Sequence, residues 1–371
     1  MRIAQVTQHF VPMRGGQEVY IQYLNRVLQE GGHTVEVFQP NRGVREPGVF
    51  LLPRCGFVSR LVHGAEPYVF NFFLHLLHRR RFAEADVLIA HYAFHAPPLR
   101  RFAEKTIVLS HGIEWHLENQ TWDDRAHERR AHWCLNRFPH VVNDTHYLRH
   151  FGYAVEPATG FFSEVAPGKW FIPNCVDTER FRAAEGIAEL KARNVILVPR
   201  QIVEDRGIDL AIRAFKHFHE KHRDIQMLIV GKRHPGAYYH LCQDLVRKYE
   251  LQQAVQFQDL IPHHEIAAYY SSAVLTLIPT LRREGTSLSA LESMSCGTPT
   301  VSTNVAGLRD LPTLQSDPEE VALASAMDDA IRRRAELAAS QSATVRTTFN
   351  LVNWAAAWLR AIEQVARRER A

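Results

Sequence analysis

The stretch EGTSLSALESMSCGTPTV, residues 284–301, follows closely on an apolar run, AVLTLIPT at residues 273–280. The apolar run predicts a buried strand, and the segment that starts at GTSLSA predicts a helix. Gly297 stands just after the helical pattern, as is usual at a helix C-terminus. A further strand, TPTVSTNV, is predicted from residue 298. A strand, a helix and a second strand in this order are typical of a parallel α/β sheet.

The same alternation runs through the rest of the chain. Short apolar runs that end in polar residues predict parallel strands buried on both faces. In the first half these runs are RIAQVTQ (2–8), HTVEVFQ (33–39), ADVLIAHY (85–92), KTIVLSHG (105–112), HVVNDT (140–145) and WFIPNC (170–175). The pattern restarts with NVILVPR (194–200), an amphipathic helix at 207–222, and the strands IQMLIVG (225–231) and AVQFQDL (254–260). We therefore expect two α/β domains, with ligands at the carboxyl ends of their strands.

A length of 371 residues is too great for one ordinary core, which again predicts two domains. A polar stretch between Asp177 and Asn194 separates the two halves of the pattern. We place the first domain at residues 1–182, the second at residues 183–350, and a closing helix at residues 351–371. An earlier helix is predicted to start at Asp317 as its cap, with Pro318 in the first turn and Glu320 completing a capping box.

The composition excludes several classes of protein. Hydrophobic residues make up 46% and charged residues 23%, as in a globular protein, and no apolar run reaches the roughly 18 residues of a membrane span. The opening strand leaves no room for a signal peptide, and five dispersed cysteines without a CxxC pair favour reduced thiols, so we expect a cytoplasmic protein. A net charge of +4 does not indicate nucleic acid, and scattered histidines without HExxH do not indicate a metal site.

Two candidate groups follow strands of the first domain. Gly15 and Gly16 lie between the first strand and the first helix, where glycine allows a ligand to approach the backbone and a helix N-terminus favours an anion. An ordinary strand-to-helix turn is the alternative. His111 ends the strand at 105–112 and could donate to a sugar hydroxyl. A histidine with only a structural role is the simpler interpretation of that residue.

Two arginines follow the first strand of the second domain. Arg200 ends this strand, and Arg206 stands directly before Gly207 and a helix. Two fixed cations suit a diphosphate, whose negative charge grows as it departs from a donor. The alternative is a solvated pair of arginines neutralised by Glu204 and Asp205.

Glu284 and Glu292 lie eight positions apart on either side of a loop of small polar residues. The loop leads into a helix, so its free backbone amides could hold phosphate. The two carboxylates could bind the hydroxyl groups of a sugar or a ribose. The alternative for Glu284 is an acidic residue favoured by the dipole of the following helix.

This spacing matches the E-x7-E signature of retaining GT-B glycosyltransferases, and the chain resembles glycosyltransferase family 4, of the glycosyl transferases group 1 type. Further segments resemble that family in the same order: the opening with its Gly-Gly loop (1–38), FIPNCVDTERF (171–181), VPRQIVEDRGIDLAIRAF (198–215) and ESMSCGTPTVSTNVAG (292–307). The resemblance spans nearly the whole chain. It implies the GT-B fold, with two Rossmann-like domains that face each other across a cleft and a final helix that crosses back to the N-terminal domain.

The resemblance also implies a role for each candidate residue. Arg200 and Arg206 would bind the donor diphosphate, Glu284 the donor sugar and Glu292 the ribose. His111 would lie near the anomeric centre. The backbone that approaches sugar and phosphate would be that of Gly15, Gly16, Thr286, Ser287 and Leu288. The sequence departs from the family where it has Arg206 for a common lysine, Thr286-Ser287 for Phe-Gly, and Cys175 for glycine.

The expected activity is transfer of a sugar, with retained anomeric configuration, from a nucleotide-sugar to a glycan or lipid-linked glycan. The donor is expected to be a UDP- or GDP-sugar, which is a substrate, so no cofactor and no metal are implied. Polysaccharide, capsule or lipopolysaccharide assembly is the expected setting, with acceptor contacts from loops at 41–70 and 112–135. The alternatives are a non-catalytic GT-B protein that binds a sugar nucleotide or a partner, and a GT-B sugar-nucleotide epimerase.

One further segment bears on location. YVFNFFLHLLHRRRF, residues 68–82, is apolar and aromatic and then basic. It could lie against an anionic membrane, which would make the protein peripheral on the inner face of that membrane. The simpler interpretation is an ordinary helix packed on the N-terminal sheet, with its basic end favoured by the helix dipole.

Overall fold

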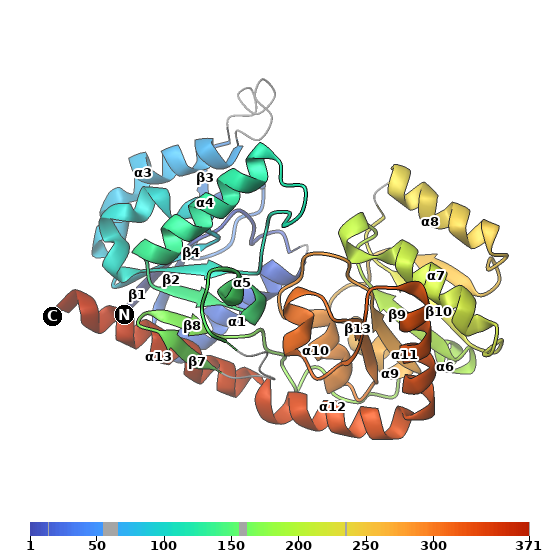
Figure 1. Ribbon diagram of the computed structural model, residues 1–371. Helices are drawn as coiled ribbons and strands as arrows, with labels where there is room; N and C mark the ends of the chain where they lie inside the picture. Colours follow the sequence, from blue (N-terminus) through green and yellow to red (C-terminus); the bar gives the residue numbers. More distant parts are fainter. Residues whose placement is uncertain (14, 55–65, 156–161, 234–235, 371) are drawn as a thin grey trace. The chain divides into compact units, whose positions relative to one another are not determined.

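The computed structural model describes residues 1–13, 15–54, 66–155, 162–233 and 236–370 (Figure 1). The chain divides into two compact units. Unit 1 holds residues 1–156, 161–173 and 352–371, and unit 2 holds residues 157–160 and 174–351. The change between the units therefore falls at Pro173 and Asn174, and the last helix belongs to the first unit.

Unit 1 is built on a sheet of eight strands in the order β3-β2-β1-β4-β5-β6-β8-β7. All neighbours pair in parallel except β7 and β8, which are antiparallel. The first six strands follow the order 3-2-1-4-5-6 of the Rossmann fold. The strands are β1 (Arg2–Val6), β2 (Thr34–Pro40), β3 (Val49–Leu52), β4 (Val87–His91), β5 (Thr106–Ser110), β6 (His140–Val142), β7 (Ser163–Ala166) and β8 (Lys169–Phe171).

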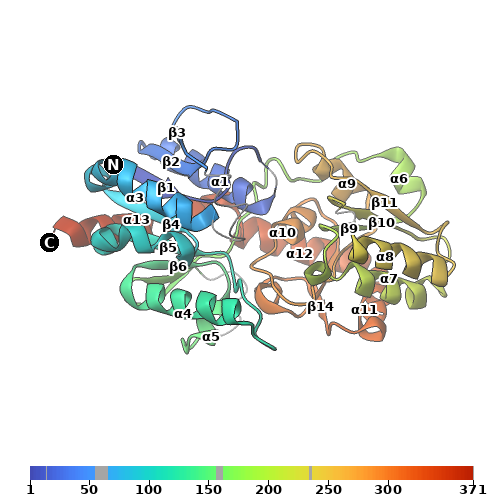
Figure 2. The same ribbon diagram turned by 90° about the horizontal axis from the view of Figure 1, so that it is seen from above.

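Helices cover both faces of this sheet. On one face α3, η2 and α4 pack on alternate residues of β1, β4 and β5, such as Val6, Ala90 and Val108. Figure 1 shows α3 and α4 on the same side of the sheet, and Figure 2 looks down on that side. The other face carries α1. The helices of unit 1 are α1 (Gly16–Glu30), α3 (Glu66–Glu84), η1 (Ala93–His95), η2 (Pro97–Lys105), α4 (Trp122–Arg137), α5 (Thr145–His150) and α13 (Leu351–Arg370).

The last helix, α13, packs on α1 although more than 300 residues separate them along the chain. Trp354 and Trp358 are fully buried, and the Trp358 indole Nε1 donates to the Tyr20 hydroxyl at 2.8 Å. The Tyr20 ring meets the Trp354 ring edge-on, with centroids 5.0 Å apart. Burial of two indoles, with the polar atom of one satisfied, fixes the C-terminal residues on unit 1.

Unit 2 has a fully parallel sheet of six strands in the order β11-β10-β9-β12-β13-β14. This again is the Rossmann order, with β9 as the first strand and the switch point between β9 and β12. The predicted α/β class with two Rossmann-like sheets is thus confirmed. The strands are β9 (Val195–Pro199), β10 (Gln226–Val230), β11 (Val255–Gln258), β12 (Leu275–Ile278), β13 (Thr300–Thr303) and β14 (Leu314–Ser316).

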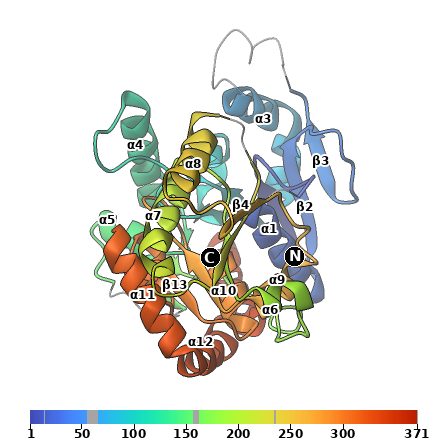
Figure 3. The same cartoon turned by 90° about the vertical axis from the view of Figure 1, so that its right-hand side faces the viewer.

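Alternate residues of these strands enter two separate cores. Ile196 and Val198 pack with α7, α8 and α11, whereas Val195 and Leu197 pack with α9, α10 and the end of α12 (Figure 3). The pattern explains why the strands read as continuous apolar runs. The helices of unit 2 are α6 (Ala188–Ala192), η3 (Glu204–Arg206), α7 (Ile208–His219), α8 (Ala237–Lys248), α9 (Ile266–Ser272), α10 (Leu288–Ser295), η4 (Ala306–Asp310), α11 (Glu320–Arg332) and α12 (Arg334–Thr348).

The predicted start of the helix near Asp317 is wrong. The helix α11 begins at Glu320, Glu319 is its N-cap, and no side chain caps it. The Asp317 carboxylate instead accepts from the Asn304 side-chain amide at 2.6 Å. A tertiary partner has therefore taken the oxygen that the sequence pattern assigned to the helix cap.

We expect Trp358→Ala to lower the free energy of unfolding of unit 1 by about 3–5 kcal/mol, because it leaves a large cavity and removes the hydrogen bond to the Tyr20 hydroxyl. Val352→Ala, at a side chain that is 77% exposed on the same helix, is the matched control and should change it by less than about 0.5 kcal/mol. Urea denaturation followed by circular dichroism measures both. Equal stability of the two variants would show that α13 does not hold this unit together.

Candidate active site

The predicted site residues of unit 2 gather at the point where the strand order of its sheet reverses. Arg200 follows β9 directly, and Glu284 lies six residues beyond the end of β12, its neighbour in the sheet. Arg206 ends the short η3 helix, just before α7. Ligands of open α/β sheets bind at the carboxyl ends of the strands at such a switch point.

Gly207 makes this gathering possible. Its backbone has a φ of +66°, which a residue with a side chain adopts only with strain. A Cβ atom at this position would also collide with the carbonyl oxygen of Pro279, at the end of β12. The turn into α7 can therefore lie directly against the end of β12, which brings Arg206 to Glu284.

One carboxylate oxygen of Glu284 accepts from three donors. Guanidinium nitrogens of Arg200 and Arg206 both bond to Oε2, and the Thr280 hydroxyl donates to it at 3.3 Å. Arg200 also donates to the Thr280 hydroxyl at 2.9 Å and to the Ser287 hydroxyl at 3.4 Å. The cluster thus holds two cations and one anion, an excess of one positive charge.

The cluster is largely shielded from water. The side chains of Arg200 and Glu284 are 7% and 11% exposed, while that of Arg206 is 31% exposed. Burial opposes ionisation of Glu284, but the charges of Arg200 and Arg206 outweigh it and hold the pKa of this carboxyl below its ordinary value. Burial lowers the pKa of the Arg200 guanidinium, an effect that Glu284 opposes. All three groups are therefore charged at neutral pH.

The alternative in which Glu204 and Asp205 neutralise the two arginines is wrong. Asp205 accepts from Arg283 Nε at 2.8 Å, and Glu204 accepts from Arg282 at 3.2 Å. These acidic residues therefore have their own partners on the loop after β12. The charges of Arg200 and Arg206 are left for Glu284 and for whatever binds beside it.

The small polar residues lead into α10 as predicted. Ser287 is the N-cap, Leu288 is the first helical residue, and the Thr286 and Ser287 side chains are buried. The Thr286 hydroxyl accepts from the backbone N–H of Asn174 at 2.7 Å, and the Asn174 side chain donates to the Thr286 carbonyl. Thr286 therefore connects the loop before α10 to Asn174, the residue at which the chain enters unit 2. The family that the sequence resembles has phenylalanine at this position.

Glu292 lies on α10 and has two partners that sequence reasoning missed. His263 Nε2 lies 2.7 Å from one carboxylate oxygen, and the Tyr270 hydroxyl donates to the other at 3.1 Å. His263 comes shortly after the end of β11, so the rule that flagged the other strand-end residues could have found it. Tyr270 lies inside α9 and gave no such signal. A carboxylate has about four acceptor positions, so Glu292 retains capacity for a further donor.

The candidates of unit 1 also lie at carboxyl ends of strands. Gly15 is the N-cap of α1 in an extended conformation, and Gly16 begins the helix. His111 follows β5, and its ring stacks on His91 at 5.8 Å and meets Tyr20 edge-on at 5.0 Å. Burial lowers the pKa of His111 to about 4, so the imidazole is neutral at physiological pH. It can donate or accept a hydrogen bond there but brings no positive charge.

Within the described parts of the chain, no three His, Cys, Asp or Glu side chains come together as metal ligands. The helices that could be searched are all too short or too polar to cross a membrane. The described cysteines Cys134, Cys175, Cys242 and Cys296 are buried free thiols, and Cys55 lies outside the described residues. Burial raises the pKa of these thiols, which makes them unreactive at neutral pH.

Two Rossmann-like units with strand-end arginines and carboxylates define the class of protein. Phosphate, which is anionic, suits the arginines and the start of α10, whereas sugar hydroxyls suit Glu284 and Glu292. This is the donor chemistry of glycosyltransferases of the GT-B fold.

Comparisons with known proteins extend the assignment. Residues 178–334 match the sequence model of the family described as glycosyl transferases group 1.

Relatives and solved structures agree with this match. The chain is 24% identical to a phosphatidylinositol N-acetylglucosaminyltransferase component of Arabidopsis thaliana, over 90% of this chain and 73% of that protein. It is 25% identical to the MMP alpha-(1->4)-mannosyltransferase of Mycolicibacterium hassiacum, over 84% and 83%. Its fold matches sucrose-phosphate synthase from Thermosynechococcus elongatus with a TM-score of 0.78, 19% identity and 98% of each chain covered. Together these findings support a glycosyltransferase of the GT-B fold whose residues 178–334 match the group 1 family.

The lowered pKa values predict that acid destabilises the fold in two ranges. His111 takes up a proton near pH 6.5 when unfolded but only near pH 4 when folded, so stability should fall as the pH drops through that interval. Glu284, whose folded pKa lies below 4.5, adds a further loss below that pH. Urea denaturation from pH 7.5 to pH 3.5, in steps of about half a unit, should show a continuous decline.

The ring of His111 can be followed directly by nitrogen NMR of histidine-labelled protein, with His111→Asn as the variant that assigns its signal. We expect the neutral form to persist down to about pH 4. A titration midpoint near 6.5 would mean that the ring is solvated in solution and would remove the argument for a neutral imidazole.

Proposed function

We propose that this glycosyltransferase transfers a sugar, with retention of anomeric configuration, from a UDP- or GDP-sugar to a glycan or lipid-linked glycan. The observation that carries the proposal is the cluster of Arg200, Arg206 and Glu284 at the switch point of unit 2. In this proposal Arg200 and Arg206 bind the diphosphate, Glu284 binds the donor sugar and Glu292 binds the ribose.

The electrostatics of the cluster suit a leaving diphosphate. Negative charge on the diphosphate grows as its bond to the sugar breaks, and two arginines fixed beforehand stabilise that state more than the ground state. Their present partner is the Glu284 carboxylate. When a diphosphate arrives, it can replace this carboxylate at the guanidinium groups, and the carboxylate can then accept from sugar hydroxyls. The arginines supply the positive charge in this scheme, so we propose a transfer that needs no metal and no cofactor.

Backbone groups and His111 complete the proposed site. The amides of Thr286, Ser287 and Leu288, at the start of α10, would face sugar and phosphate. Gly15 and Gly16 would let the start of α1 approach the diphosphate. His111, being neutral, would donate to a sugar hydroxyl near the anomeric carbon without bringing a positive charge.

The names of the relatives support the choice of acceptor. The plant relative is named for phosphatidylinositol, a lipid, and a further relative, from Escherichia coli, is named for colanic acid biosynthesis. We propose that the acceptor of this chain is a glycan or a lipid-linked glycan in the assembly of cell-surface polysaccharide or lipopolysaccharide. Acceptor contacts are proposed for the segments 41–70 and 112–135, which include β3, the start of α3 and most of α4. Residues 55–65 lie outside the described structure. Such an acceptor suits a cytoplasmic enzyme that lies peripherally on the membrane.

The first experiment is a screen of the purified protein against UDP-, GDP- and ADP-sugars without added metal. Thermal shift reads binding, and release of the nucleoside diphosphate reads slow hydrolysis. Stabilisation by one donor together with its hydrolysis supports the proposal and names the base and the sugar. Binding without hydrolysis or transfer would favour a non-catalytic sugar-nucleotide-binding protein, and conversion of the donor to an epimer would favour an epimerase.

We expect Arg200→Ala, Arg206→Ala and Glu284→Ala each to lower turnover by roughly 100-fold or more, because the arginines act on the departing diphosphate and Glu284 binds the donor sugar. Arg282→Ala is the matched control. Its side chain is half exposed and bonds to Glu204, outside the cluster, so its loss should cost less than about threefold. Turnover of the identified donor measures the effect of each substitution, and circular dichroism confirms that each variant is folded. Near-normal turnover in all three cluster variants would refute the site.

His263→Ala should weaken binding of the nucleoside diphosphate by about tenfold while leaving kcat nearly unchanged, because a hydrogen bond to a charged group contributes roughly 1.5–3 kcal/mol. The reason is that His263 holds the carboxylate proposed to bind the ribose. His264→Ala, at the exposed neighbouring residue, is the control. Isothermal titration calorimetry measures the affinity. A fall in kcat with unchanged affinity would place Glu292 elsewhere in the reaction.

A further inference from the structure

The helix α3 is apolar on its buried side and on its exposed side. Phe70, Leu74 and Phe82 pack into the core of unit 1. Tyr68, Phe72 and Leu76 recur at every fourth residue, so they form one stripe along the helix, and they are 60%, 63% and 62% exposed. With Leu77, this one helix holds four of the twelve large hydrophobic side chains that are exposed in the described structure. Phe72 and Leu76 have no part in the proposed transfer.

Exposed arginines surround the stripe. Arg79 and Arg80 lie on α3, Arg100 on η2 and Arg129 on α4, and none of them forms an ion pair with a carboxylate in the part of the chain that the structure describes. Arg81 differs, because it bonds to Glu36 at 2.8 Å.

The acidic residues of the same three elements mostly have partners of their own. Glu66 pairs with Arg42 and Arg54, Glu84 with Arg2, and Glu128 with His150. Glu104 on η2 and Asp123 on α4 are exposed, while Asp124 on α4 lies 3.1 Å from His116. The four free arginines therefore leave this side of unit 1 positively charged.

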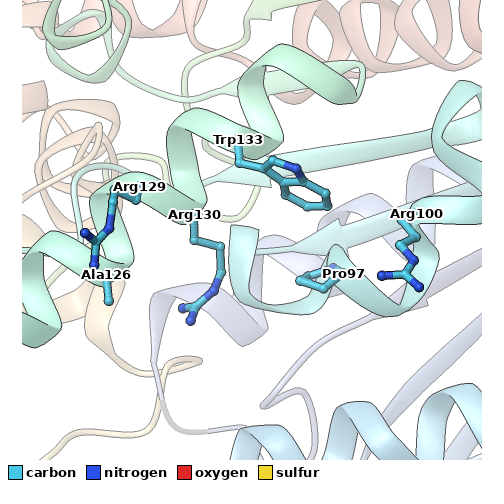
Figure 4. A pocket seen from close by; sticks show the side chains of 6 residues that line it. All are labelled: Pro97, Arg100, Ala126, Arg129, Arg130 and Trp133. Carbon is cyan, nitrogen blue, oxygen red and sulfur yellow. The ribbon is translucent and has the colours of Figure 1, made fainter.

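A shallow groove of about 440 Å³ lies between η2 and α4, within unit 1 (Figure 4). Figure 4 shows the side chains of Arg130 and Trp133 projecting from α4 toward η2. Three of its lining residues are arginines and one is a tryptophan that is 37% exposed. The lining residues are Pro97, Arg100, Ala126, Arg129, Arg130 and Trp133.

The groove and the stripe form one continuous surface. The Tyr68 ring on α3 lies 4.9 Å from the Phe94 ring on η1, edge-on. The Arg130 guanidinium lies over the same Phe94 ring at 4.3 Å, and it also donates to the Tyr68 hydroxyl at 3.5 Å. Figures 1 and 2 place α3 and α4 on the same side of the sheet. The apolar side chains and the arginines therefore face outward together.

We infer that this surface, made by α3, η2 and α4, docks on a lipid bilayer with anionic headgroups. Phe72, Leu76 and Tyr68 enter the interface between headgroups and acyl chains, where apolar and amphipathic aromatic side chains are stable. Arg79, Arg80 and the arginines of the groove bind headgroup phosphates, which guanidinium groups recognise with paired donors. Neither the apolar stripe nor the arginines alone would identify a membrane. Together they match the acyl-chain region and the anionic headgroup region of a bilayer. The inference adds a partner to the proposed transfer and does not depend on it.

Flotation of the full chain with vesicles tests this inference. Phosphatidylcholine vesicles with and without phosphatidylglycerol are the probes. We expect the protein to float with the anionic vesicles and to be released by high salt. Two variants separate the two parts of the surface. Phe72→Ser/Leu76→Ser removes the apolar contact, and the charge variant combines Arg79→Gln, Arg80→Gln and Arg100→Gln.

Each variant should reduce the fraction bound to anionic vesicles by about tenfold or more. Arg81 is left in place because of its bond to Glu36. A control variant loses the same number of charges at exposed residues of unit 2: Lys221→Gln, Arg223→Gln and Lys248→Gln. The control should float like the wild type. Circular dichroism and donor hydrolysis should be unchanged in all variants, so failure to bind lipid is distinguishable from failure of the proposed catalysis.

Three results would overturn the inference. The first is a wild-type protein that floats with neither vesicle. The second is a charge variant that floats as well as the wild type, or a control variant that loses binding equally. The third is a wild-type protein that forms dimers by analytical ultracentrifugation and loses them in Phe72→Ser/Leu76→Ser, since a second copy of the chain would then cover the stripe.

Discussion

The site depends on the sharing of one Glu284 oxygen between two buried or half-buried guanidinium groups. A cation taken out of water needs an anion close by, and Arg200 has only this carboxylate as its charged partner among the described residues. The pairing requires the end of β9, the end of β12 and the turn before α7 to meet at one point. The parallel sheet supplies the first two, and Gly207 supplies the third because a side chain there would collide with Pro279. The same meeting point is where an α/β sheet of this order leaves room for a ligand.

This arrangement also explains how two cations can be held close together before a phosphate binds. Glu284 neutralises much of their positive charge, and the excess of one positive charge remains for an incoming anion. Exchange of one anion for another at the guanidinium groups leaves neither arginine without an anionic partner. Glu292 is held in a similar way by His263 and Tyr270, so both carboxylates are oriented before any substrate binds. Such prior orientation reduces the entropy lost on binding.

Unit 1 shows that one helix can serve two surroundings. The segment at 68–82 had two interpretations, a helix packed on the sheet or a helix on a membrane. The first is confirmed for Phe70, Leu74 and Phe82, which lie in the core. It leaves Tyr68, Phe72 and Leu76 unexplained, because an ordinary surface helix would carry polar residues there. Large exposed apolar patches in globular proteins usually mark an interaction surface.

The sequence by itself determined most of the strands and their division into two sheets, although β3, β7 and β14 were not predicted. It could do so because fully buried parallel strands read as apolar runs, and because strand-end residues gather at one edge of a sheet. Only the tertiary structure decided which charges pair. Glu204 and Asp205 are next to Arg206 in sequence, yet their partners are Arg282 and Arg283, and Asp317 bonds to Asn304 in place of capping a helix. The sequence also did not predict the partners of Glu292 or the exposed stripe on α3. Side-chain pairing and exposure depend on which elements pack together, and periodicity along the chain does not encode that packing.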